Sequence, residues 1–232
     1  MARDLEERII KTTELLVRPA LCLYETWQDE AGIDANVWTS VVTGTGAVAR
    51  NVAEPPYLKV LLSGTTNADT AHLYSDQRWF CGPDTYGANT ILKRLILEFE
   101  AKFATVASID NALFFMGLGS IQETLRTTNN IAGFILTADA LNSITDDGVG
   151  EVVKAVGAPV LTTWHKYRIA VYAGAIGFYI DEALIVAHTT AAVERLPDTA
   201  MYLNFTLNQE AAANSGELHT GIIRLWTEDV IR

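Results

Sequence analysis

The chain has 232 residues and a mass of 25.4 kDa, long enough for one large all-β core. Lys and Arg number 17 against 28 Asp and Glu, a net charge of -11. A nucleic-acid binder needs a basic face to neutralise phosphates, so this charge argues against that class of partner. Hydrophobic residues make up 49% and charged residues 19%. This apolar balance predicts that part of the surface is buried in a homo-oligomer or against other subunits.

The N-terminal residues 1–19 predict a short α-helix. Leu5, Ile9 and Leu16 recur at helical spacing, and Pro19 predicts its end because the residue before a proline disfavours the α region. A helix this short is marginal in water, so it either lies on the main domain or docks onto a neighbouring subunit as an assembly arm. Acidic residues interrupt the first fourteen positions, so we expect no signal peptide and synthesis in the cytosol.

The rest of the chain alternates short apolar runs with turn residues. Residues 81–89 are rich in Gly and Pro and predict a loop. Short strands with a turn about every ten residues are typical of a two-sheet sandwich. The predicted strands are 37–42, 57–62, one beginning at 71–74, 95–103, 113–119, 132–137, 152–155, 160–161 and 201–207.

The stretch 163–188 predicts adjoining antiparallel strands. Its side chains alternate, with Tyr167 on one face and Lys166 and Arg168 on the other, the period of a half-buried strand. The same stretch is apolar enough to be mistaken for a membrane span. Arg168 and the acidic pair at 181–182 are costly in hydrocarbon, so we predict a hairpin and no membrane span.

The cysteines and histidines give little indication of a disulfide bond or a metal site. Cys22 and Cys81 are either free thiols or a bridge that ties the N-terminal strand to a loop. The four histidines are isolated and lack zinc-ligand spacing. We therefore predict no metal-ligand set from spacing, and no cofactor.

The segment W-H-x-Y-R-I, then F-Y-I-D, then a short strand ending in His-Thr, resembles the concanavalin A-like lectin/glucanase superfamily, including its laminin-G-like branch. Segments 95–103, 113–119, 201–207 and 216–226 fit the same family in order. The resemblance implies an all-β fold, a two-sheet antiparallel jelly-roll sandwich over residues 20–232. It does not imply one activity.

Glycan-cleaving members of this superfamily resemble each other in a strand with Glu-x-Asp-x-Glu, which presents an acid and a nucleophile on one face. The matching strand here carries Glu98 and Glu100 on one face, but Lys102 follows them. We therefore expect a face of alternating charges and no catalytic residues. Many members also hold a structural calcium ion with oxygen ligands, which leaves three candidate ligands here: Asp29, Asp34 and Asp229.

A glycan or partner face is predicted on residues 201–208. Tyr202, Asn204, Thr206 and Asn208 share one side of this strand and combine an aromatic ring with amides, which suits sugar hydroxyls and ring faces or a protein contact. Two nearby aromatic residues could add stacking: Trp79 and Tyr86.

The segment 38–58, with its Trp, Gly-Thr-Gly and Tyr-Leu, resembles lectin-like decoration or fibre proteins of tailed-phage virions. That resemblance implies a non-catalytic structural or adhesive subunit located in a virion, with capsid or tail proteins and its own copies as partners. A carbohydrate-binding module is the first alternative, with surface glycans as partners. A glycoside hydrolase of the same superfamily is the second.

Overall fold

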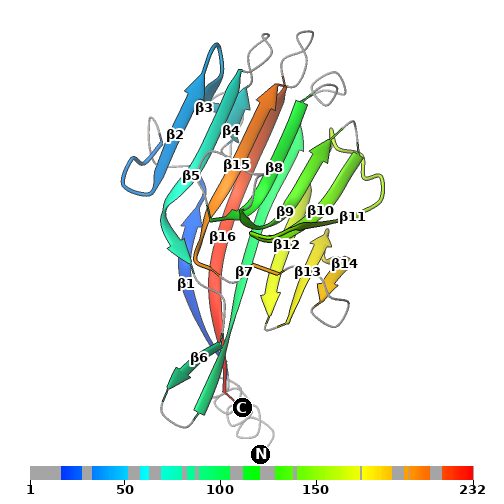
Figure 1. The fold of residues 1–232 in the computed structure, drawn as a ribbon. Helices are drawn as coiled ribbons and strands as arrows, with labels where there is room; N and C mark the ends of the chain where they lie inside the picture. Colours follow the sequence, from blue (N-terminus) through cyan, green and yellow to red (C-terminus); the bar gives the residue numbers. More distant parts are fainter. Residues whose placement is uncertain are drawn as a thin grey trace, which may run out of the picture.

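The computed structural model describes residues 17–27, 33–51, 58–62, 69–79, 83–86, 89–104, 112–120, 129–137, 140–172, 174–189, 196–197, 199–209 and 216–231. These residues form two antiparallel sheets packed face to face, which confirms the predicted all-β sandwich (Figure 1). They include no helix, and none therefore that is long and apolar enough to cross a membrane.

The predicted N-terminal helix falls largely outside these residues, and Leu5, Ile9 and Leu16 with it. Strand β1 (Val17–Glu25) already begins at Val17, so the end of the predicted helix is extended chain instead. Its partner is the C-terminal strand, with Pro19 opposite Glu228. The cysteine side chains also lie outside the described part of the chain, and their pairing stays open.

Sheet A is built around two long strands, β7 (Asn89–Phe103) and β16 (Glu217–Ile231). Its main order is β14-β13-β12-β7-β16-β4-β3, while β1 also pairs with β16 and β6 with β7. The other members are β3 (Ala47–Asn51), β4 (Leu58–Leu62), β6 (Pro83–Tyr86), β12 (His165–Tyr172), β13 (Ala175–Ile180) and β14 (Ala183–Thr189).

Sheet B has the order β11-β10-β9-β8-β15-β5-β2. Its strands are β2 (Trp38–Thr43), β5 (Thr70–Trp79), β8 (Ala112–Gly119), β9 (Asn130–Thr137), β10 (Ala140–Asp147), β11 (Glu151–Ala155) and β15 (Met201–Gln209). The predicted hairpins at 163–188 are confirmed as β12, β13 and β14. Asp181 and Glu182 both take positive φ values, 49° and 71°, in the two-residue turn between β13 and β14.

The core between the sheets is aromatic at its centre. The ring of Phe99 in sheet A stacks on Tyr167 at 5.4 Å and meets Phe205 of sheet B edge-on at 5.3 Å. Phe134 of sheet B lies 5.0 Å from Tyr167. Each such pair adds about 0.5–1.5 kcal/mol beyond the burial of its area. Burial raises the pKa of the Tyr167 hydroxyl, and the negative charge of Asp181 adds to this rise.

Buried polar groups join the two sheets near their edge. The Nε2 and Nδ1 atoms of His188 on β14 each lie 2.8 Å from a hydroxyl of β10, those of Ser143 and Thr145 respectively. The ammonium group of Lys154 on β11 donates to the carbonyl oxygen of Ala187 at 2.8 Å. The sequence pattern does not predict β10, because two of its buried side chains, Ser143 and Thr145, carry hydroxyl groups, which these bonds satisfy.

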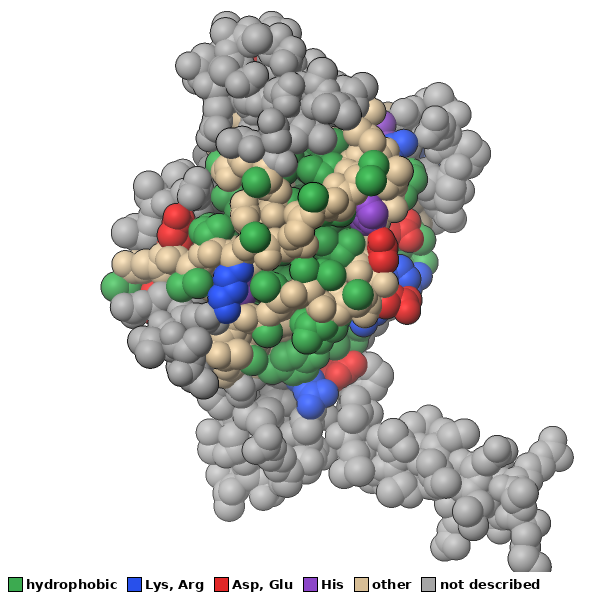
Figure 2. Space-filling model, turned by 90° about the vertical axis from the view of Figure 1, so that its right-hand side faces the viewer, with side chains coloured by type: hydrophobic (Ala, Val, Ile, Leu, Met, Phe, Trp, Pro, Cys, Tyr) green, Lys and Arg blue, Asp and Glu red, His purple; other side chains and the backbone are tan. Residues whose placement is uncertain are grey.

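The edge strands β11 and β14 lie on the side of the molecule that faces the viewer in Figure 2, where hydrophobic side chains are interspersed with a few charged ones. Val153, Leu184 and Ile185 are exposed there. The pairing of β13 with β14 contains a register shift between Phe178 and Tyr179. Such an irregularity bends an edge strand and makes it a poorer template for a further strand.

Candidate functional site

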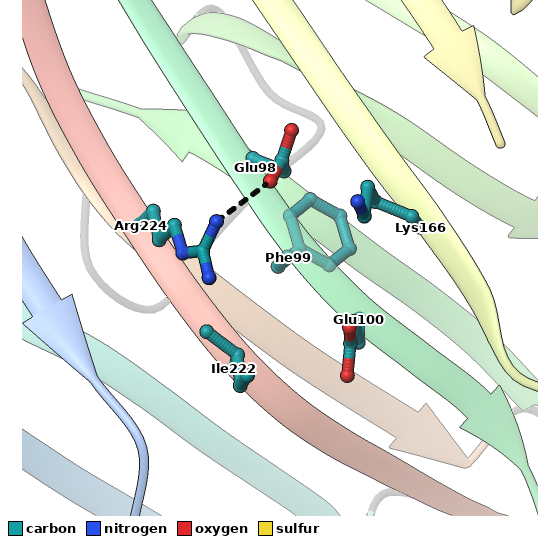
Figure 3. A pocket seen from close by; sticks show the side chains of 6 residues that line it. All are labelled: Glu98, Phe99, Glu100, Lys166, Ile222 and Arg224. Carbon is teal, nitrogen blue, oxygen red and sulfur yellow. Dashed lines mark ion pairs between the residues drawn. The ribbon is translucent and has the colours of Figure 1, made fainter. Parts of the chain in front are cut away.

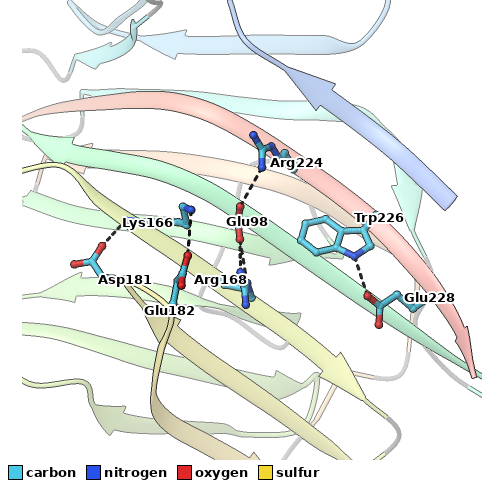
Figure 4. A network of polar contacts seen from close by, with 8 residues as sticks. All are labelled: Glu98, Lys166, Arg168, Asp181, Glu182, Arg224, Trp226 and Glu228. Carbon is cyan, nitrogen blue, oxygen red and sulfur yellow. Dashed lines mark hydrogen bonds and ion pairs between the residues drawn. The ribbon is translucent and has the colours of Figure 1, made fainter. Parts of the chain in front are cut away.

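The outer face of sheet A carries a row of charged side chains centred on Glu98 of β7. The strand register places Glu98 opposite Arg168 of β12 and Arg224 of β16. The Nε and Nη2 atoms of Arg168 donate to Glu98 Oε2 at 3.0 and 2.7 Å, and Arg224 Nη1 lies 3.7 Å from Oε1 (Figure 4). Glu98 is only 7% exposed, so these two cations hold a nearly buried carboxylate.

Aromatic rings close this row at both ends. The guanidinium carbon of Arg168 lies 5.8 Å from the ring centre of Tyr179, its cross-strand partner on β13. The guanidinium carbon of Arg224 lies 5.5 Å from the ring centre of Tyr24, its partner on β1. Cation–π contacts of this kind contribute about 0.5–1 kcal/mol at exposed sites. We call these five cross-strand residues the Glu98 row.

A shallow pocket lies beside the Glu98 row and contains a second carboxylate. Glu100 lies opposite Lys166 and next to a register shift in β16 between Thr220 and Ile223. A Cβ atom on Gly221, inside this shift, would lie 3.0 Å from both Cβ and Oε2 of Glu100, so glycine lets the carboxylate lie against β16. The pocket holds about 230 Å³ of space and is lined by Glu98, Phe99, Glu100, Lys166, Ile222 and Arg224 (Figure 3).

An exposed tryptophan extends this site along the same face. Trp164 immediately precedes β12 and is 40% exposed. Lys102, which faces His219 across the strands, places its ammonium nitrogen 5.2 Å from the Trp164 ring centre. Gly221 also lies close to this ring, since a Cβ added there would be 3.6 Å from it. An accessible indole beside charged hydrogen-bonding groups is suited to the apolar face of a sugar ring.

The turn between β13 and β14 fixes the start of β12. Asp181 accepts a hydrogen bond from the Lys166 backbone N–H at 2.9 Å, and its other oxygen lies 2.7 Å from His165 Nδ1. Desolvation alone raises the pKa of Asp181, but the hydrogen bonds and positive charges of His165 and Lys166 together lower it below the ordinary 3.8. Ionised Asp181 therefore stabilises the fold.

We expect Asp181→Asn to lower the melting temperature at pH 7 and to have a smaller effect at pH 3. A carboxyl with a lowered folded-state pKa stabilises the protein above its unfolded value of 3.8, and this stabilisation is lost as the pH falls through the folded value. The effect at pH 7 should be small, because the side chain is 56% exposed. Thermal melts at both pH values test this, with Glu182→Gln as a control; an equal effect at both would contradict it.

The predicted glycan or partner face lies on the opposite side of the sandwich, on the outer face of sheet B. Tyr202, Asn204, Thr206 and Asn208 share this face, while the intervening residues point into the core. Tyr202 is 9% exposed, and Asn204 and Thr206 are fully buried, so the face is not an open platform in this structure. Its role in binding stays a prediction. Trp79 packs against the core from β5, and the side chain of Tyr86 lies outside the described part.

The described residues offer no metal centre. No three His, Cys, Asp or Glu side chains gather among them. Of the predicted calcium ligands, Asp34 is the one whose side chain is described. Its Oδ1 atom accepts hydrogen bonds from the backbone and side-chain nitrogens of Asn36, both at 2.9 Å. Such bonds cap a local turn, so Asp34 serves that turn. Asp29 and the side chain of Asp229 lie outside the described part of the chain.

No protein-family model and no curated protein matches the sequence, but solved structures with a similar fold exist. A β-1,3-glucanase from Mycobacterium marinum matches with a TM-score of 0.61 and 10% identity, over 89% of this chain and 99% of that one. The catalytic domain of an endo-1,3-β-glucanase (laminarinase) from Thermotoga petrophila matches with a TM-score of 0.62 and 12% identity, over 90% and 97%. A third protein, an immunostimulatory antigen and pseudo β-1,3-glucanase of Mycobacterium tuberculosis, matches with a TM-score of 0.65 and 11% identity, over 89% and 98%.

These structures confirm the concanavalin A-like jelly-roll fold. They also correct the prediction of a non-catalytic phage virion subunit. The match to a β-1,3-glucanase covers 89% of this chain, so nearly the whole chain has the fold of these enzymes. The virion resemblance depended on the local pattern at 38–58, and a turn followed by a strand occurs in many sandwiches. The predicted capsid or tail partners, homo-oligomer and virion location stay predictions.

Proposed function

We propose that this chain acts on a β-linked glucan, which it binds on the outer face of sheet A. The exposed Trp164 ring beside the Glu98–Glu100 pocket is the observation that carries this proposal. Sugar recognition needs an aromatic surface for the C–H face of a ring and polar groups for its hydroxyls. Lys102, Glu100 and Lys166 supply such groups along the same face. The fold shared with β-glucanases supports a glucan as the ligand.

Cleavage of the bound glucan is a second, finer candidate function. It is favoured by the presence of Glu98 and Glu100 in one pocket, since glycoside hydrolases use a pair of carboxyl groups beside the scissile bond. Two guanidinium groups hold the Glu98 carboxylate in place, so Glu98 would be the fixed carboxylate of this pair. Glu100 is the more exposed of the two and is the group placed to give a proton to the leaving oxygen.

One set of measurements tests both functions. We expect the protein to co-sediment with an insoluble β-1,3-glucan, and Trp164→Ala to weaken this binding about tenfold, because the stacking surface is removed. We expect reducing sugar to be released from soluble laminarin, and Glu100→Gln to lower the rate at least about a hundredfold, the usual range for a general acid.

Two exposed residues away from the pocket provide matched controls. Leu184→Ala removes an exposed hydrophobic side chain of β14, and Glu151→Gln removes an exposed carboxylate of β11. Neither should change binding or rate. Absence of glucan binding by the unmutated protein would overturn the proposed function. Binding without release of reducing sugar would overturn the cleavage step alone.

A further inference from the structure

A second pocket lies where strand β1 of sheet A approaches strands β2 and β5 of sheet B. It holds about 300 Å³ of space and is lined by Leu23, Asn36, Val37, Gln77 and Trp79. None of these residues lines the Glu98–Glu100 pocket. The pocket is small and partly open to solvent, so it suits contact with one ligand residue better than with a polymer chain.

The residues that line this second pocket have the chemistry of a neutral sugar site. Trp79 offers an aromatic surface, and Asn36 and Gln77 offer carboxamides, which both donate and accept hydrogen bonds. Leu23 and Val37 add apolar surface. The described lining residues include no charged side chain, which favours a neutral ligand. A ring with an apolar C–H face and several hydroxyl groups matches this combination.

The pocket is also held in shape before any ligand arrives. The side-chain nitrogen of Asn36 donates to Asp34 Oδ1 at 2.9 Å, which orients the amide group. The Asp76 N–H donates to the Val37 carbonyl oxygen at 2.9 Å and so joins the turn before β2 to β5, next to Gln77. Trp79 packs against the core. A preorganised site loses less conformational entropy when it binds.

We propose that this second pocket binds a single neutral sugar residue, such as a glucose unit at the end of a glucan chain. The choice of glucose rests on the proposed function, while the class of neutral sugar rests on the pocket itself. This second pocket is separate from Trp164 and the Glu98–Glu100 pocket on sheet A. The protein would therefore hold the end of a glucan chain in the second pocket and the body of a polysaccharide on sheet A.

Methyl β-D-glucoside is the probe, and saturation-transfer NMR with titration calorimetry is the measurement. We expect binding by the unmutated protein, and at least tenfold weaker binding by Asn36→Ala combined with Gln77→Ala. Both of these side chains are exposed, so the double variant should fold. Trp79→Phe keeps a ring against the core and should weaken binding less. Asn142→Ala, which removes an amide from β10, should leave it unchanged.

Absence of glucoside binding by the unmutated protein, or equal binding by the double variant, would overturn the sugar pocket. Equal or tighter binding of charged glucuronate would also overturn it, because no described lining residue is a cation. Trp164→Ala should leave glucoside binding intact while it weakens co-sedimentation with the insoluble glucan. Failure of this pocket and failure of the proposed function therefore give different results.

Discussion

Replacing Phe99 by Ala should lower the free energy of unfolding by about 3–5 kcal/mol, the usual loss for a large buried aromatic side chain. Phe99 is fully buried and contacts aromatic rings from both sheets: Tyr167 at 5.4 Å, Phe205 at 5.3 Å and Phe134 at 6.4 Å between ring centres. Truncation leaves a cavity, and these rings cannot fill it because the backbone of their strands fixes their positions. Urea denaturation followed by circular dichroism measures the loss.

Two substitutions calibrate this result. Phe99→Leu keeps most of the volume and should lose less than Phe99→Ala. Val149→Ala truncates an exposed hydrophobic side chain and should change stability by less than about 0.5 kcal/mol. A loss below about 1 kcal/mol for Phe99→Ala would show that the two sheets do not pack through this aromatic centre.

Removing Arg168 should have the second largest effect, a loss of about 3 kcal/mol for Arg168→Ala. Glu98 is 7% exposed, so the substitution leaves a nearly buried carboxylate without its two closest donors. Arg224, at 3.7 Å, compensates only in part. Chemical denaturation at low and high salt checks this. The loss should change little with salt, because an ion pair shielded from solvent is screened less than a surface pair.

The opposite substitution should be milder. Glu98→Gln leaves two arginines whose side chains are 32% and 44% exposed, and water can solvate them. The double substitution Glu98→Gln with Arg168→Gln should recover much of the loss, because no buried charge then remains. Equal losses for the two single substitutions would contradict this asymmetry and would mean that Glu98 is solvated in solution.

Those strands could be predicted from the sequence in which apolar and polar side chains alternate along the strand itself. The alternation of Tyr167 with Lys166 and Arg168 gave the correct faces of β12, and the turn at Asp181 gave the hairpin of β13 and β14. Strand β10 was missed because Ser143 and Thr145 point inward, and only their contact with His188, far along the chain, makes this favourable. Strand β6 was missed because its pairing with β7 lies inside a segment rich in Gly and Pro.

The candidate site was predictable only in part, for a related reason. The sequence placed Glu98 and Glu100 on one face, but the arginines that hold Glu98 come from strands about 70 and 126 residues away. Cross-strand register is set by the whole sheet and leaves no local pattern. The sequence showed Trp164 as part of the W-H-x-Y-R-I segment but did not predict its exposure, because that exposure depends on how β12 begins.

The order of strands in sheet A also has a consequence for the timing of folding. Strand β16 lies inside the sheet, paired with β7, β4 and β1, yet it is the last strand in the sequence. During synthesis β1 and β7 leave the ribosome long before β16. The part of the sheet that contains β7 and the part that contains β1 and β4 therefore cannot pair through β16 until synthesis is nearly complete. Contacts this distant in sequence slow folding. Nascent chains that end before residue 217 would lack the centre of sheet A and expose its unpaired edges to chaperones.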